Sequence, residues 1–116
     1  MAVGFQWVFR LINEKNKFKT MIRHSVILKL KVEISSEDKQ AFFDAVDKLS
    51  IIPNVQKFEV LKQISSKNKF EYGISMEFDN QEQYDIYSNH AEHVAFIQNF
   101  WMKSVEDFLE IDYIIL

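Results

Sequence analysis

Two stretches of the chain alternate between apolar and polar residues, which is the pattern of a β-strand with one buried face. The first begins near Met21, and the second covers residues 70–79. The apolar row of the first stretch is His24, Val26, Leu28, Leu30 and Val32, and that of the second is Phe70, Tyr72, Ile74, Met76 and Phe78. His24 is therefore expected to point into the same buried layer as its apolar neighbours.

The segment between these two strands carries a helix signal and then a second strand. Residues 35–38 read Ser-Ser-Glu-Asp, a capping hydroxyl followed by acids in the first turn. Apolar residues at helical spacing continue this helix to about Ser50. Pro-Asn at 53–54 then turns the chain into a strand predicted over residues 55–64.

After the alternating stretch at 70–79 the pattern becomes helical again. Asp79 or Asn80 is expected to cap a helix, with Glu82 in capping-box position after Asp79. Polar residues at 88–89 interrupt this helix, and a further helical stretch is predicted over 91–104.

The chain closes with a strand predicted over residues 105–115, in which two rows alternate. The more apolar row, which is expected to face the core, is Leu109, Ile111, Tyr113 and Ile115. The opposing row is Phe108, Glu110, Asp112 and Ile114. The acidic residues of this strand are therefore expected on the face of the sheet that is turned away from the helices.

The resulting order, β-α-β-β-α-α-β, predicts an α+β, ferredoxin-like fold: a four-stranded antiparallel sheet with helices on one face. The other face is expected to be mixed. Its charged residues would be Arg23, Lys29, Lys57, Glu59, Glu71, Glu77, Glu110 and Asp112, and its apolar ones Ile27, Leu61, Phe108 and Ile114. Such a face is either solvated or a self-complementary surface about a two-fold axis, and we expect a homodimer.

Residues 1–20 differ from the rest of the chain. They hold four basic residues against one acidic residue, whereas residues 21–116 hold ten against sixteen. A short apolar pattern at helical spacing, residues 5–12, is too brief to span a membrane and is followed by a polar break. We interpret residues 1–20 as an extension ahead of a single domain at 21–116, although a short amphipathic helix lying on a membrane or a partner is an alternative.

Composition excludes several classes of function. The chain has no cysteine, which excludes disulfides, thiolate metal sites and thiol nucleophiles and favours a cytoplasmic protein. With two glycines and one proline it has no Gly-rich phosphate loop, so no nucleotide cofactor is expected. The net charge of −3 and the lack of a basic stripe argue against nucleic acid as a partner, and no membrane partner is expected for the domain.

The stretch from Tyr87 to His93 gathers a phenol and two of the three imidazoles of the chain, just before the aromatic residues Phe96, Phe100 and Trp101. Histidine titrates near neutral pH, so Tyr87, His90 and His93 form a candidate acid/base set. The same residues are equally suited to capping a helix and to hydrogen bonding without any chemistry. Together with His24, the two histidines are also a conceivable metal site, but the spacing matches no specific metal motif, and no metal is expected.

Several segments taken together resemble the stress-responsive α/β-barrel (Dabb) family. They are residues 21–30, the Val55-x-x-Phe-Glu-Val60 strand, residues 72–79, Tyr87-x-x-His-x-x-His93 and the closing strand at 105–113. The resemblance covers residues 21 to about 113 in the family's order. It implies a homodimer whose two sheets pack face to face into a barrel.

The resemblance also implies a chemistry, through a plant polyketide cyclase of the family that closes a linear poly-β-ketone by an aldol reaction without a cofactor. By that analogy His93 would be the general base, Tyr87 would donate a hydrogen bond to the enolate oxygen, and His24 would orient the substrate. His90 also aligns with a histidine of that enzyme. Ala91 stands where the plant enzyme has a proline.

Three classes of function remain open from the sequence. One is a cofactor-independent enzyme of the cyclase kind, which acts on a small apolar carbonyl compound. The second is a ligand-binding or stress-protective homodimer with the same pocket, and the third is an interaction module whose fold serves only dimerisation. A cavity lined by the three candidate catalytic residues, with Leu28, His90 and Phe96 as ligand contacts, would favour the first two, while side chains filling that space would favour the third.

Overall fold

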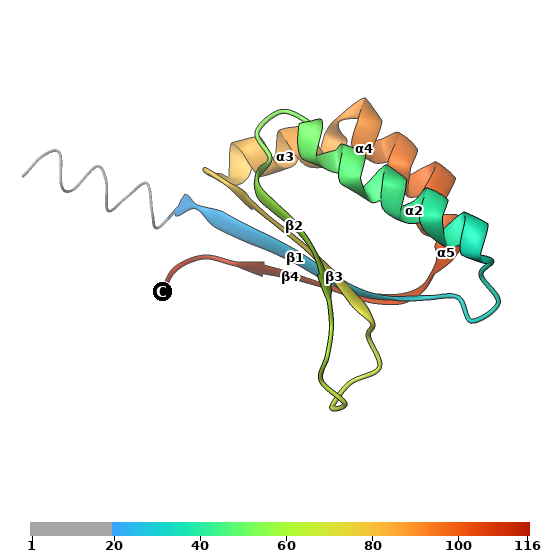
Figure 1. The fold of residues 1–116 in the computed structure, drawn as a ribbon. Helices are drawn as coiled ribbons and strands as arrows, with labels where there is room; N and C mark the ends of the chain where they lie inside the picture. The colour runs from blue at the N-terminus through green and yellow to red at the C-terminus, as the bar shows by residue number, and fades with distance from the viewer. Residues whose placement is uncertain (1–19) are drawn as a thin grey trace, which may run out of the picture.

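The structure is a computed structural model that describes residues 20–116, so the expectations for residues 1–19 lie outside it. Figure 1 shows a single sheet with the helices gathered over one of its faces. The strands are β1 (Ile22–Leu30), β2 (Gln56–Lys62), β3 (Tyr72–Phe78) and β4 (Val105–Tyr113). The helices are α2 (Ser36–Lys48), η1 (Leu49–Ile51), α3 (Gln81–Asn89), α4 (Ala91–Phe96), a π-helical turn η2 (Ile97–Trp101) and α5 (Met102–Ser104).

The sheet has the order β2-β3-β1-β4, and every neighbouring pair is antiparallel. This arrangement confirms the predicted ferredoxin-like fold. The two long helical stretches between strands account for it, because each carries one apolar stripe that must be buried against the sheet. No helix within residues 20–116 is long and apolar enough to cross a membrane.

Local capping chemistry sets the helix boundaries. The Ser35 hydroxyl accepts a hydrogen bond from the Asp38 amide at the start of α2. Asn80, not Asp79, caps α3 by accepting from the Gln83 amide. Glu82 is then only two residues beyond the cap, so the predicted capping box does not form.

The core lies between the helices and the alternating row of β1 and β3. Leu28, Phe42, Val46 and Phe78 are completely buried in this layer. His24 is in the same row, opposite Met76 of β3, and only 7% of its surface is exposed. Its predicted direction, into the helix-facing layer, is therefore confirmed.

A β-bulge reverses the predicted orientation of β4. Leu30 of β1 pairs with Val105, but the preceding Lys29 pairs with Asp107, so Glu106 is an extra residue on β4. One extra residue moves every following side chain to the opposite face. The assignment of the rows of β4 was therefore wrong: those facing the helices are Phe108, Glu110 and Asp112, and those facing away are Leu109, Ile111 and Tyr113.

The face of the sheet opposite the helices is called the open face below. It combines apolar side chains with an ion-pair cluster. The apolar residues in register on it are Ile27 of β1, Leu61 of β2, and Leu109, Ile111 and Tyr113 of β4. The cluster is centred on Glu77, whose Oε1 accepts from the Arg23 guanidinium at 2.8 Å and whose Oε2 lies 3.4 Å from Lys57 Nζ.

Glu77 is unusually buried for a carboxylate, with 4% of the residue exposed. Lys57 reaches it from a second irregularity of the sheet, where the register shifts between Gln56 and Glu59 and Lys57 adopts a φ of 48°. The hydrogen bond from Arg23 lowers the pKa of Glu77 below its ordinary value of 4.5, burial opposes this, and Lys57 adds to the lowering.

Replacing this carboxylate should therefore destabilise the fold in a pH-dependent way. We expect Glu77→Gln to lose on the order of 1–3 kcal/mol near neutral pH, because two cations lose their shared acceptor. Since the folded pKa is the lower one, this stabilisation is present above the unfolded pKa and disappears as the pH falls through the folded pKa. Urea denaturation at several pH values should show that the free energies of unfolding of the wild type and Glu77→Gln become equal in acid.

The matched control is Glu59→Gln, which removes an exposed carboxylate of β2 on the same face. A change within about 0.5 kcal/mol is expected there. Equal losses in the two variants, or a Glu77→Gln deficit that persists at acid pH, would contradict the role of the buried pair.

Candidate active site

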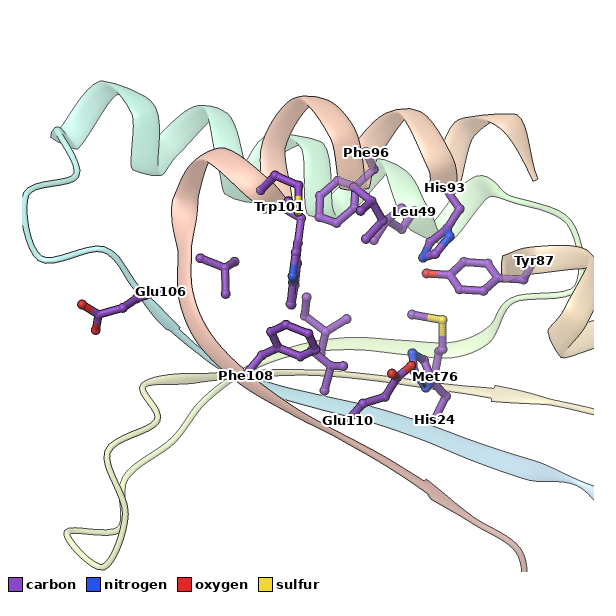
Figure 2. Close-up of a pocket in the computed structure, with 15 residues that line it drawn as sticks. His24, Leu49, Met76, Tyr87, His93, Phe96, Trp101, Glu106, Phe108 and Glu110 are labelled. Atoms are coloured by element: carbon purple, nitrogen blue, oxygen red, sulfur yellow. Dashed lines mark ion pairs between the residues drawn. The ribbon is translucent and has the colours of Figure 1, made fainter. Parts of the chain in front are cut away.

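A cavity of about 420 Å³ lies between the sheet and the helices, on the side of β4. Figure 2 shows the side chains that converge on it from β1, β3, β4, α3 and the α4–α5 stretch. Its walls are mainly apolar and aromatic, with a few polar groups at one end. The lining residues are His24, Val26, Leu49, Ile74, Met76, Tyr87, His93, Phe96, Ile97, Trp101, Met102, Val105, Glu106, Phe108 and Glu110.

Four of the six residues predicted for the site line this cavity: His24, Tyr87, His93 and Phe96. The other two do not. Leu28 is completely buried in the core beside the cavity, and the Nδ1 of His90 accepts the Glu92 amide as the N-cap of α4. The interpretation of His90 as a cap was one of the alternatives open from the sequence.

His90 is also where the helix breaks. Its ψ of 139° is extended, so α3 ends at Asn89 and α4 starts a new helix at Ala91. The interruption predicted at residues 88–89 is therefore confirmed, and the break itself falls at His90. It brings Tyr87 and His93 together from two helices, with ring centroids 4.6 Å apart.

The imidazole of His93 has a defined orientation. Its Nδ1 lies 2.9 Å from the carbonyl oxygen of Ser88, at the end of α3. A carbonyl only accepts, so Nδ1 carries the proton and Nε2 keeps its lone pair. Burial lowers the pKa of His93, the bond to Ser88 opposes this, and the neighbouring His24 lowers it further. His93 is thus a neutral imidazole with one free basic nitrogen at neutral pH.

Tyr87 supplies the complementary group. Figure 2 shows its hydroxyl pointing into the cavity towards the His93 ring. The residue is almost completely buried, and burial, with a smaller contribution from the charge of Glu110, raises the pKa of its phenol. Tyr87 therefore stays protonated over the physiological range and can donate a hydrogen bond into the cavity.

His24 belongs to a second cluster on the sheet side of the cavity. Its Nδ1 lies 2.6 Å from Asp112 Oδ1 on β4 and 2.8 Å from the hydroxyl of Tyr84 on α3. The Tyr84 hydroxyl is in turn 2.9 Å from Asp112 Oδ2 and 3.3 Å from Glu110 Oε1. Burial, followed by the bond to Asp112, raises the pKa of Tyr84 and keeps its proton available for these acceptors.

Sequence reasoning missed Tyr84, Glu110 and Asp112. Tyr84 precedes Tyr87 by three residues on α3, so a signal for a shared face was present. The two acids were assigned to the open face because the bulge at Glu106 has no residue signature such as a glycine. Their place beside His24 follows from register, which the sequence pattern alone does not determine here.

The same cluster contains the one group of potential metal ligands found among residues 20–116. Ligand atoms of His24, Glu110 and Asp112 lie within 4.8 Å of one another. The three histidines do not form a metal site together, because Nδ1 of His90 accepts a hydrogen bond from the Glu92 amide at the start of α4. Within this group His24 and Asp112 already form a donor and acceptor pair at 2.6 Å.

Aromatic residues form the opposite end of the cavity. Trp101 packs edge-to-face on Phe108 of β4, with centroids 5.3 Å apart, and Phe96 lies 6.2 Å from Trp101. The π-helical turn η2 widens the helix between Phe96 and Trp101, and both of its terminal residues, Ile97 and Trp101, line the cavity. The predicted aromatic stripe thus has two roles, as core and as cavity wall.

Chemically, this arrangement combines a free imidazole nitrogen and a neutral phenol at one side of an apolar space. A base with a pKa near or below neutral and a buried hydrogen-bond donor suit the removal of a weakly acidic proton and the stabilisation of the resulting oxyanion. The low polarity of the walls strengthens both interactions.

Comparison with known proteins places the chain among relatives of the same fold. The profile of the family described as "Stress Responsive A/B Barrel Domain" matches residues 22–115. Olivetolic acid cyclase from Cannabis sativa is 32% identical over 89 residues, which cover 71% of this chain and 88% of that protein.

Two solved structures have the same ferredoxin-like fold. A Dabb family protein with a ferredoxin-like fold from Mesorhizobium loti is 46% identical, with a TM-score of 0.78 over 84% of this chain and 98% of its own. A dimeric ferredoxin-like protein of unknown function from Bacteroides fragilis is 24% identical, with a TM-score of 0.67 over 84% of this chain and 99% of its own.

The environment of His93 predicts its titration. We expect its imidazole to titrate below the ordinary histidine pKa of 6.5, because the desolvated ring resists protonation. His93 then contributes stability that is present above the unfolded pKa and is lost as the pH falls through the folded pKa. Histidine-selective NMR follows the three imidazoles of the chain, and the signal that disappears in His93→Gln identifies this one. A midpoint at or above 6.5 would contradict the desolvated, neutral base.

Proposed function

The chain belongs to the stress-responsive A/B barrel domain family, and from this premise we propose that it is a cofactor-independent enzyme that removes a proton from a carbon acid. Its substrate is a small apolar carbonyl compound bound in the cavity, and the reaction is of the aldol type used by a polyketide cyclase. The observation that carries the proposal is the free Nε2 of His93, whose Nδ1 proton is committed to Ser88, beside the phenol of Tyr87.

In the proposed mechanism His93 Nε2 takes the proton from a carbon next to a carbonyl group. The electrons of the broken C–H bond move to the carbonyl oxygen, and Tyr87 stabilises this enolate with a hydrogen bond. The enolate carbon then forms a bond to a second carbonyl carbon of the same substrate, and the new alkoxide takes the proton back from the imidazolium. Atoms and charge balance without a cofactor.

His24 acts in this proposal as a positioning residue. Its ring is held by Asp112 and Tyr84, so it offers a rigid polar surface at the sheet side of the cavity. Olivetolic acid cyclase supports a cyclase-like activity by its relatedness, but an aldol reaction in this chain is our inference.

The alternative function is a ligand-binding or stress-protective homodimer that uses the same cavity without turnover. The apolar and aromatic walls, which would bind an apolar molecule with or without chemistry, favour it as the second candidate. A pure interaction module is disfavoured, because the side chains of residues 20–116 leave a cavity of about 420 Å³ between the helices and the sheet.

Replacement of the base separates these functions. We expect His93→Gln to lose roughly 10²–10⁴-fold in the rate of deuterium incorporation between the carbonyls of an apolar alkyl 1,3-diketone, corrected for the buffer rate and followed by NMR. Its melting temperature should stay near that of the wild type. Tyr87→Phe should also slow the exchange, because it removes the hydrogen bond to the enolate.

The matched control is His90→Asn, which changes a nearby histidine outside the cavity and keeps a good N-cap residue for α4. Its exchange rate should equal that of the wild type. Catalysis is rejected if the wild type exchanges no faster than buffer, and binding of the diketone without exchange would support the non-catalytic alternative.

We also propose that the open face pairs with a second copy of the chain. Two of its apolar residues, Leu61 and Leu109, are each nearly half exposed. They share the face with charged residues of both signs, Arg23, Lys57 and Glu77. Such a surface suits an isologous interface. The Bacteroides fragilis protein is described as dimeric, which supports the same assembly here.

Sedimentation tests this assembly directly. An interface of the usual size, about 1,600 Å² in total, should hold a dimer of twice the 13.8 kDa chain mass at micromolar concentration. Leu109→Lys, which places a charge in the apolar row, should shift the protein to a monomer. A wild type that sediments only as a 13.8 kDa species would refute the dimer.

A further inference from the structure

The sheet side of the cavity has more hydrogen-bond acceptors than donors. Two carboxylates of β4, Glu110 and Asp112, meet one imidazole and one phenol there. Figure 2 shows the Glu110 carboxylate beside the His24 ring, on the boundary of the cavity. Carboxylates only accept, so every proton in this cluster must come from His24 or Tyr84.

Both available protons go to Asp112. The His24 Nδ1 proton is directed at Asp112 Oδ1 at 2.6 Å, and the Tyr84 hydroxyl has its closest carboxylate contact with Asp112 Oδ2, at 2.9 Å. Glu110 Oε1 is left with the longest distances, 3.3 Å to the Tyr84 hydroxyl and 3.8 Å to His24 Nδ1. A hydroxyl has only one proton to donate, and Asp112 is the nearer acceptor for it. Glu110 therefore receives the weaker hydrogen bond from Tyr84.

The charges of the residues around the cavity also single out Glu110. None of the described residues that line the cavity is a lysine or an arginine. Even a protonated His24 would offset only one of the two carboxylates. The other acid that lines the cavity, Glu106, differs because Lys29 Nζ lies 3.6 Å from its Oε2. The excess negative charge at the cavity is therefore that of Glu110.

We propose that Glu110 is a specificity-determining residue that selects an amine head group, so that the ligand of this cavity is an apolar carbonyl compound carrying an amine and not a carboxylate. An ammonium group supplies N–H donors to a carboxylate that has only a long contact with Tyr84, and positive charge to a lining without lysine or arginine. The apolar body of such a ligand extends along Phe108 and Trp101, and its carbonyl group reaches Tyr87 and His93 in the same cavity. This inference deepens the proposed function and rests on it.

The expected strength of the preference for an amine follows from the solvent exposure of Glu110. The side chain of Glu110 is 53% exposed, so solvent screens its charge and the preference should be moderate and sensitive to salt. A carboxylate ligand meets repulsion at the same position. We expect about tenfold tighter binding of the cation than of the anion at low ionic strength, and a smaller ratio in high salt.

The experiment compares three probes of one chain length: octylamine, 1-octanol and octanoate. Each is titrated against the full chain carrying Trp7→Phe, so that all indole emission comes from Trp101 in the cavity wall. EDTA keeps divalent ions from the carboxylates. The expected order of affinity is octylamine, then 1-octanol, then octanoate. Glu110→Gln should bring the amine and the carboxylate several-fold closer, whereas the matched Glu106→Gln should keep their ratio.

The outcomes separate this inference from the function on which it rests. If 1-octanol binds and the two charged probes bind equally well, the cavity is a ligand site but the amine selection is overturned. An amine preference that survives unchanged in Glu110→Gln overturns the assignment to this residue. If none of the probes changes the Trp101 emission, both the inference and the proposed use of the cavity fail.

Discussion

The bulge at Glu106 is the constraint on which both surfaces of the sheet depend. It lets β4 pair with β1 on both sides of an extra residue, and thereby turns Phe108, Glu110 and Asp112 towards the helices. Without that extra residue the two acids would lie on the open face and the apolar row would face the helices. A polar end for the cavity and an apolar open face are thus two results of a single irregularity in hydrogen bonding.

The two histidines of the cavity are held in opposite ways. His24 lies against a carboxylate and a phenol, partners that fix the ring and consume its Nδ1 proton. His93 lies against one backbone carbonyl, which fixes the same proton but adds no charge. A carbonyl partner leaves the second nitrogen a free base in an apolar setting, whereas a carboxylate makes the ring part of a rigid network. The proposed mechanism uses this difference, with proton transfer at His93 and a positioning role for His24.

Much of this arrangement is predictable from the sequence, because the strongest signals are local. The alternation around His24 predicts the direction of its side chain, and the break before Ala91 is visible in the polar residues at 88–89. The orientation of β4 is not predictable in this way. Its more apolar row looks like a core row, and a bulge depends on the pairing of two strands far apart in the chain.

His90 illustrates the same limit on a smaller scale. A histidine between two helices fits a ligand contact and a helix cap equally well by type, and only the extended backbone at residue 90 decides for the cap. The role of a polar residue at a helix boundary is thus set by one torsion angle, which the residue pattern constrains only weakly.

The construction of β4 also ties the two faces of the sheet together mechanically. Alternate side chains of this nine-residue strand touch the cavity and the open face, and no other layer lies between them. A ligand that displaces Glu110 or Phe108 by moving the strand moves Leu109 and Ile111 by the same amount. Any such displacement at the cavity would therefore reach the outer surface through the thickness of a single backbone.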